Sequence, residues 1–189
     1  MTYVEYKNLK KTLNPPSRKG TGGTGGRGRE IKTICCIDPG TRNTGIFILE
    51  VENRTPLYYD VISLGETPDQ QIKALGEVMT MGVDLFLVER QIATNSKAVR
   101  LSVVIVTFLL MNFPNSIVAE VPSTLKLGKE RGEGGRRDTK KICILKAEQI
   151  MNDTPSYKGM KEFVDKRKKK DDISDVICYA EETIKEILV

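Results

Sequence analysis

Two short segments each place a carboxylate directly after an apolar run, and carboxylates are the side chains that hold divalent cations in many hydrolytic sites. Asp38 follows the apolar run Thr33 to Ile37 and opens a glycine-bounded turn that ends at Gly45. Glu89 follows the apolar run Asp84 to Val88 in the same way. Side chains at strand ends can reach a ligand from the edge of a sheet. If the two strands are neighbours, Asp38 and Glu89 lie side by side.

A third segment is acidic and opens a predicted apolar helix with Asp171, Asp172 and Asp175. The i, i+3 spacing puts Asp172 and Asp175 on one helix face, whereas Asp171 points roughly 100° away. An aspartate at a helix N-terminus contributes about 1 kcal/mol as a cap, which explains one of the three residues but not all of them. Asp171 is therefore an auxiliary candidate beside the other two.

Each segment alone has an ordinary structural explanation. The Asp-Pro-Gly sequence at Asp38 favours a hairpin turn, and a lone Glu89 at a strand end is usually solvated. Brought together, Asp38, Glu89, Asp172 and Asp175 would repel one another and raise their pKa values unless a cation joins them. Oxygen ligands of this kind predict two Mg²⁺ ions, for which Mn²⁺ can substitute, that activate a water and stabilise a leaving oxygen. Gln91 could assist by orienting substrate.

Basic residues near the acidic segments favour a polyanionic partner, in line with the formal net charge of +5. They gather around a glycine-rich loop and directly before the acidic cluster, which predicts a track for a phosphodiester backbone. A solvated charged face is the ordinary alternative for either run alone. The candidate nucleic-acid contacts are Lys126, Arg136, Arg137, Lys140, Lys141, Lys168, Lys169 and Lys170.

Composition excludes several classes of chemistry. Histidine is absent, which rules out Ser-His-Asp and Cys-His nucleophiles, Cys-His zinc sites and histidine-based nucleases. The four cysteines show no CxxC spacing, so a reducing compartment is expected. The longest apolar run, Leu101 to Met111, is far short of the roughly 20 residues of a membrane span. We therefore expect an intracellular protein with no membrane partner and no small-molecule substrate.

The pattern along the chain predicts one α/β domain behind a tail. Residues 1–30 have too few apolar side chains to repay the entropy of ordering, so we expect a flexible, basic, glycine-rich arm or a bare tail. Residues 31–189 carry elements in the order βββαβαβαα, which predicts an RNase H-like fold: a five-stranded mixed sheet, its first three strands antiparallel, flanked by helices. The expected strands cover residues 33–37, 46–51, 57–62, 84–88 and 116–121, and the expected helices residues 68–81, 95–112, 138–151 and 172–188.

The helix expected at residues 95–112 is apolar nearly all round over its second half, which is too broad a face for covering one side of a sheet. Such a helix is either central in the domain or part of a subunit interface.

Taken in order, the three acidic motifs resemble the RuvC-type Holliday-junction resolvases, and within them the poxvirus branch. The matching segments are Ile37 to Gly45, Val88 to Gln91 and Lys169 to Val176, within a resemblance that spans residues 31–189. The resemblance implies a two-metal site at the four carboxylates named above, and a homodimer that nicks opposing strands of a four-way DNA junction. In the poxvirus setting it also implies resolution of branched junctions in concatemeric genomes in the host cytoplasm.

Other functions compete with this one. The turn from Asp38 to Gly45 also resembles the phosphate-binding turn of actin-like ATPases and sugar kinases, but those need two such domains and lack the C-terminal acidic helix. A non-catalytic DNA-binding module would be free to lose its acids, and all four are present. Within nucleases, an RNA–DNA hybrid, a flap or another branch stays open as substrate, because the metal site alone does not distinguish these.

Overall fold

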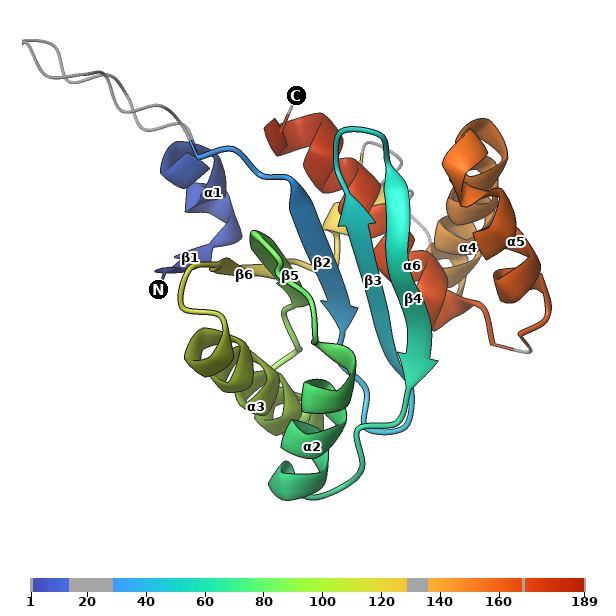
Figure 1. Cartoon of the computed structure of the whole chain (residues 1–189). Coiled ribbons are helices and arrows are strands. Elements are labelled where there is room, and N and C mark those ends of the chain that lie inside the picture. The colour runs from blue at the N-terminus through green and yellow to red at the C-terminus, as the bar shows by residue number, and fades with distance from the viewer. Residues whose placement is uncertain (1, 14–28, 129–135, 168, 189) are drawn as a thin grey trace, which may run out of the picture.

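The computed structural model describes residues 2–13, 29–128, 136–167 and 169–188, the side chains of residues 136 and 137 excepted. A six-stranded mixed sheet forms its centre, in the order β1-β6-β5-β2-β3-β4 (Figure 1). The strands are β1 (Thr2–Glu5), β2 (Thr33–Asp38), β3 (Thr44–Glu50), β4 (Thr55–Ile62), β5 (Leu85–Glu89) and β6 (Ile117–Val121).

Chain order explains the strand directions. β2, β3 and β4 follow one another through short turns and pair antiparallel, whereas β5 and β6 return through helices and pair parallel to their neighbours. The crossover helices are α2 (Pro68–Val78) and α3 (Ser96–Asn112). A capping box fixes the start of α2, because Thr67 accepts from the backbone N–H of Gln70 while the Gln70 side chain accepts from the backbone N–H of Thr67.

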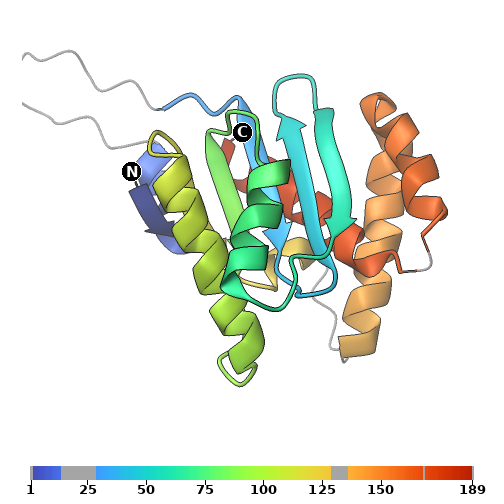
Figure 2. The ribbon, with the colours of Figure 1, turned by 60° about the horizontal axis from the view of Figure 1, so that its bottom comes forward.

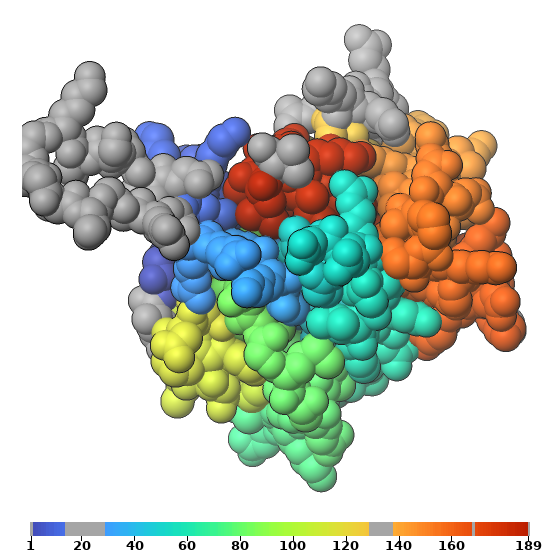
Figure 3. All heavy atoms as spheres, turned by 45° about the horizontal axis from the view of Figure 1, so that its top comes forward, coloured from blue at the N-terminus to red at the C-terminus, as the bar shows by residue number. Residues whose placement is uncertain are grey.

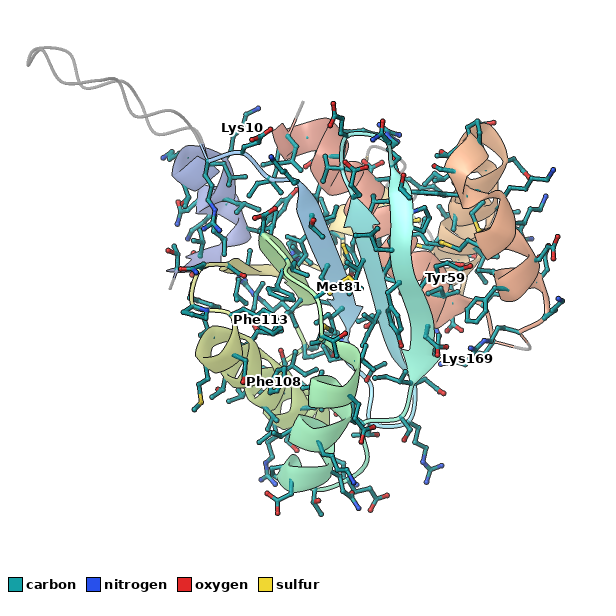
Figure 4. The ribbon with its side chains drawn as sticks, viewed as in Figure 1. Lys10, Tyr59, Met81, Phe108, Phe113 and Lys169 are labelled. Atoms are coloured by element: carbon teal, nitrogen blue, oxygen red, sulfur yellow. The ribbon has the colours of Figure 1, made fainter. Side chains whose placement is uncertain are left out.

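Helices cover both faces of the sheet, and alternate strand residues enter the two cores that result. On one face, α2 and α3 lie side by side (Figure 2), and Phe113 after α3 packs against Phe86 and Phe108 (Figure 4). The other face carries α1 (Tyr6–Leu13) and α6 (Asp171–Thr183); α4 (Arg136–Asp153) packs beside α6, and α5 (Lys158–Asp165) packs against α4.

All thirteen residues of α6 are buried, because the helix runs between the sheet and α4. A short π-helix, η3 (Ile184–Leu188), continues it. Because α6 is buried, its polar side chains need hydrogen-bond or ion-pair partners inside the protein. Glu181, for example, forms an ion pair with Arg54 at 2.7 Å and accepts a hydrogen bond from the hydroxyl of Tyr157 at 2.7 Å. Helices in the described part of the chain are all too short or too polar to cross a bilayer.

The prediction of a flexible arm over residues 1–30 is wrong for residues 2–13, because these residues form β1 and α1. β1 pairs with β6, and Val4, Leu9 and Leu13 are buried in the core. Lys10 of α1 reaches the carbonyl of Glu186 at 3.4 Å (Figure 4), and α1 lies beside the C-terminal turns in the space-filling view (Figure 3). The sheet consequently has six strands rather than five. Residues 14–28 of the expected arm lie outside the described part of the chain.

Candidate metal centre

Two carboxylates emerge at one edge of the sheet. Asp38 is the last residue of β2 and Glu89 the last residue of β5. The two strands are parallel neighbours, with Ile37 opposite Val88, so their carboxyl ends meet at the same edge. Figure 1 shows the arrowhead of β2 at this edge.

The start of α6 approaches the same edge across β3. It lies against Gly45, the residue that pairs with Asp38 in the sheet. A Cβ atom at position 45 would lie 3.0 Å from the carbonyl carbon of Asp172 and closer still to its oxygen, so a glycine is required here. This close approach allows Asp175, one turn further along α6, to reach the strand ends.

Asp38, Glu89 and Asp175 form a carboxylate cluster. Each offers one oxygen, and the three oxygens lie within 4.8 Å of one another. Glu89 and Asp175 are buried and Asp38 is half-buried. Burial, followed by the hydrogen bond and the negative charge of Glu89, raises the pKa of Asp38 well above its usual range. Burial also raises the pKa of Asp175, and the positive charge of Lys126 offsets this only in part.

Lys126 lies inside the cluster. It belongs to the 3-10 turn η1 (Leu125–Leu127), and its Nζ lies 3.6 Å from Oε1 of Glu89 and closer to Oδ2 of Asp175. The ammonium also stands 5.5 Å from the centre of the Tyr179 ring, a cation–π contact. Burial opposes the charge, but Asp175 and Glu89 outweigh it and raise the pKa of Lys126. The sequence placed Lys126 on a surface track, whereas the structure places it among the acids.

The other predicted site residues, Asp171, Asp172 and Gln91, bond to partners outside the carboxylate cluster or to the backbone. Both carboxylate oxygens of Asp172 bond to Nζ of Lys169, at 2.8 and 2.6 Å. Asp171 pairs with Lys140. Burial of Asp171 opposes ionisation, but these lysines outweigh it and lower its pKa. The side chain of Gln91 donates to the backbone carbonyl of Glu89 at 3.3 Å.

The cluster fits a divalent cation. Its donors are carboxylate oxygens only, which suit Mg²⁺ and Mn²⁺. Oδ1 of Asp175 is buried and has no hydrogen-bond partner among the described residues, so a buried acceptor is available. Lys126 brings one positive charge to three carboxylates, which leaves negative charge to balance. Asp38, Glu89 and Asp175 would hold the cation.

The predicted DNA contacts gather at the start of α4 and before α6. Lys140 and Lys141 are exposed on α4, and Lys169 and Lys170 precede α6. Lys170 pairs with Asp165 at 2.7 Å. Arg136 and Arg137 begin α4, but their side chains, like Lys168, lie outside the described part of the structure.

Sequence reasoning did not identify Tyr179 or the internal role of Lys126. A lysine between Leu125 and Leu127 gives a weak signal, because an apolar neighbour on each side is the only sign of its burial. Tyr179 lies four residues after Asp175, one helical turn along the same face. That spacing was the available signal for a fifth residue at the site.

Comparison with known proteins gives a family. A family model for the Poxvirus A22 protein matches residues 32–186. The chain belongs to the poxvirus A22 protein family. The search of curated proteins found no match.

Solved structures place this A22 family member among known folds. The crystal structure of the fowlpox virus Holliday junction resolvase has a TM-score of 0.63 at 18% identity, covering 83% of this chain and 99% of that one. The fowlpox virus resolvase with its substrate Holliday junction DNA gives 0.62 at 20%, with coverage of 83% and 99%. Thermus thermophilus RuvC gives 0.53 at 12%, with coverage of 79% and 92%. These likenesses confirm the predicted RNase H-like fold.

Proposed function

We propose that this A22 family member is a metal-dependent endodeoxyribonuclease that resolves four-way DNA junctions by paired symmetric nicks. The observation that carries the proposal is the convergence of Asp38, Glu89 and Asp175 at one edge of an RNase H-like sheet. Two of the similar structures are a fowlpox virus Holliday junction resolvase and its complex with junction DNA. The natural substrate would be the branched junctions of concatemeric viral genomes.

The chemistry follows from the donor set. Bound Mg²⁺, two ions per site with Mn²⁺ as a substitute, would supply the Lewis acidity for an in-line displacement at phosphorus. Asp38, Glu89 and Asp175 would hold the ions, and Asp172 would join them once Lys169 turns to a phosphate. Lys126 offsets part of the negative charge of the carboxylates and offers a charged hydrogen-bond donor beside them.

The DNA backbone would run along the lysines next to the site. Lys140, Lys141, Lys169 and Lys170 flank the start of α6, and Arg136 and Arg137 belong to the same run of α4. Lysines now paired with Asp171 or Asp172 can exchange those partners for phosphate oxygens. Lys168 would extend this track.

We also infer a homodimer, because a twofold enzyme can place two sites on the twofold-related strands of one junction. α3 is the candidate interface. Its Leu101, Ile105 and Leu109 are buried against the sheet, while Val103 and Met111 are 59% and 73% exposed on the opposite side. If one face of α3 packs on the sheet and the opposite face on a second copy of the chain, apolar residues are expected on both faces.

The host cytoplasm is the compartment that the family suggests. All four cysteines, Cys35, Cys36, Cys143 and Cys178, are free thiols, which suits a reducing environment.

The test uses a labelled immobile four-way junction, a matched duplex and an RNA–DNA hybrid in Mg²⁺. Wild type should make paired symmetric nicks in the junction, and Asp38→Asn should lower the rate on the order of a thousandfold, roughly 4 kcal/mol. Asp69→Asn, the same change at an exposed position of α2, is the matched control. Cleavage of the hybrid alone would indicate a ribonuclease, and junction binding without cleavage a DNA-binding module; either result would refute the proposal.

A further inference from the structure

A buried charge network contacts the backbone of Lys126. Lys146 of α4 and Glu182 of α6 form an ion pair, with Nζ 3.1 Å from Oε1 and only 9% of each side chain exposed. The same ammonium donates a hydrogen bond to the backbone carbonyl of Lys126, 3.1 Å away. One lysine therefore joins α4, α6 and the turn η1, whose Lys126 side chain lies among the carboxylates.

Gly128 shows how closely η1 fits against this pair. Its φ is +55°, a left-handed conformation that side chains disfavour. A Cβ atom there would lie 2.8 Å from Cδ of Glu182 and 3.1 Å from Nζ of Lys146. The backbone thus passes directly over the ion pair, with no room for a side chain between them.

Packing alone does not account for the pair. Two charged groups lose hydration when they are buried, and an apolar pair of similar volume would join α4 to α6 without that cost. Glu182 also accepts a second cation, Lys185, at 3.2 Å, but this one is 52% exposed. Lys146 differs from Lys185 in being buried and in donating a hydrogen bond to the backbone carbonyl of Lys126.

We propose that Lys146 and Glu182 are positioning residues of the nuclease centre. They fix the backbone of η1 so that the Lys126 ammonium stays between Glu89 and Asp175. The inference rests on the proposed nuclease function, and both residues act through Lys126.

The first experiment compares Lys146→Met with Lys185→Met, which removes a cation from the same carboxylate but leaves the link to Lys126. Single-turnover nicking of prebound junction should fall about 100-fold in Lys146→Met, as expected for a catalytic group displaced by about 1 Å. Junction affinity should hold in both variants, and Lys185→Met should nick like wild type. Lys146→Arg keeps a buried donor and should recover most of the rate. Equal rates in the two methionine variants, or a loss confined to junction affinity, would overturn the inference.

A second readout does not depend on nuclease activity. With Lys126 released from the carboxylates, Mn²⁺ meets one less competing positive charge, so Lys146→Met should bind Mn²⁺ about tenfold more tightly by calorimetry. Lys126→Met should shift the affinity in the same direction, and Lys185→Met should leave it unchanged. A wild type that binds Mn²⁺ but nicks nothing would refute the proposed function, while the affinity order of the variants would still decide this inference. Unchanged Mn²⁺ affinity in Lys146→Met would overturn it.

A third variant separates positioning from folding. Lys146 lines a cavity of about 220 Å³ together with Arg54, Gln149 and Lys185, among others. Lys146→Ala should therefore admit ethylammonium at millimolar concentration and regain nicking rate with it. A rate that ethylammonium leaves unchanged, in a variant that is folded at the assay temperature, would count against a positioning role.

Discussion

Gly45→Ala tests how the carboxylate cluster is assembled. The new Cβ would lie 3.0 Å from the carbonyl carbon of Asp172, and backbone cannot turn aside as a long side chain can. Carbon contacts are comfortable at about 3.5–4.0 Å, so the start of α6 must retreat by roughly 1 Å. The retreat would carry Asp175 away from the strand ends.

Two effects of different size should follow. Overpacking at a buried contact costs about 1–3 kcal/mol of unfolding free energy. A shift of about 1 Å in a catalytic group can lower the rate about 100-fold. We therefore expect Gly45→Ala to stay folded at 25 °C, with junction nicking lowered far more than its stability would explain.

The assay is single-turnover nicking of the immobile junction in Mg²⁺, with urea unfolding on the same preparations. Gly76→Ala is the matched control, because a Cβ there meets nothing within 4 Å, and alanine in place of glycine within α2 should stabilise the protein by up to about 0.5–1 kcal/mol. If Gly45→Ala nicks at the wild-type rate, the close approach of α6 to β3 does not set the geometry of the cluster, and the reasoning fails.

Three further predictions concern stability and metal. Leu9→Ala should lower the free energy of unfolding by about 2–4 kcal/mol, against under 0.5 kcal/mol for exposed Lys11→Ala; equal urea midpoints would mean that α1 adds nothing to the fold. Arg54→Met removes the cation that pairs with the buried carboxylate of Glu181. It should lower the free energy of unfolding by about 1–2 kcal/mol, a figure reduced for the solvent around the 37% exposed arginine, and Glu181→Gln should restore part of that loss. Purely additive free energies in this double-mutant cycle would argue against the ion pair. Mn²⁺ at 100 times its Kd should stabilise wild type by about 2.7 kcal/mol in thermal unfolding and leave Asp38→Asn nearly unshifted, whereas equal shifts would place the metal elsewhere.

The strands that carry the site could be predicted because their signals are local. β-branched and aliphatic runs mark β2 and β5, and a helical crossover makes them parallel neighbours, so acids that follow each run reach one edge. The convergence of Asp38 and Glu89 follows from these two facts. The helix that begins at Asp171 was equally visible, since an apolar run follows its acids.

The remainder depended on distant contacts. β1 is four residues long, and its pairing partner β6 lies more than a hundred residues further along the chain, so nothing nearby in the sequence marks it as ordered. Lys126 is buried only because Asp175 and Glu89 neutralise it. Asp172 has the right spacing for the cluster, yet Lys169, three residues earlier, engages both of its oxygens. Which charged side chains pair with one another depends on the folded structure, and such pairing produces no periodic pattern in the sequence.

The pairing of β1 with β6 also bears on how the protein is made. Tyr3 of β1 bonds to Glu120 of β6 across 117 residues of chain. A ribosome adds roughly 5–20 residues each second, so β1 would wait on the order of ten seconds for its partner strand to appear. During that interval its backbone donors and acceptors are unmatched, and a four-residue strand is short enough to make a poor template for other chains. The outer strand of the sheet is thus paired only after β6, the later of the two segments, has been made.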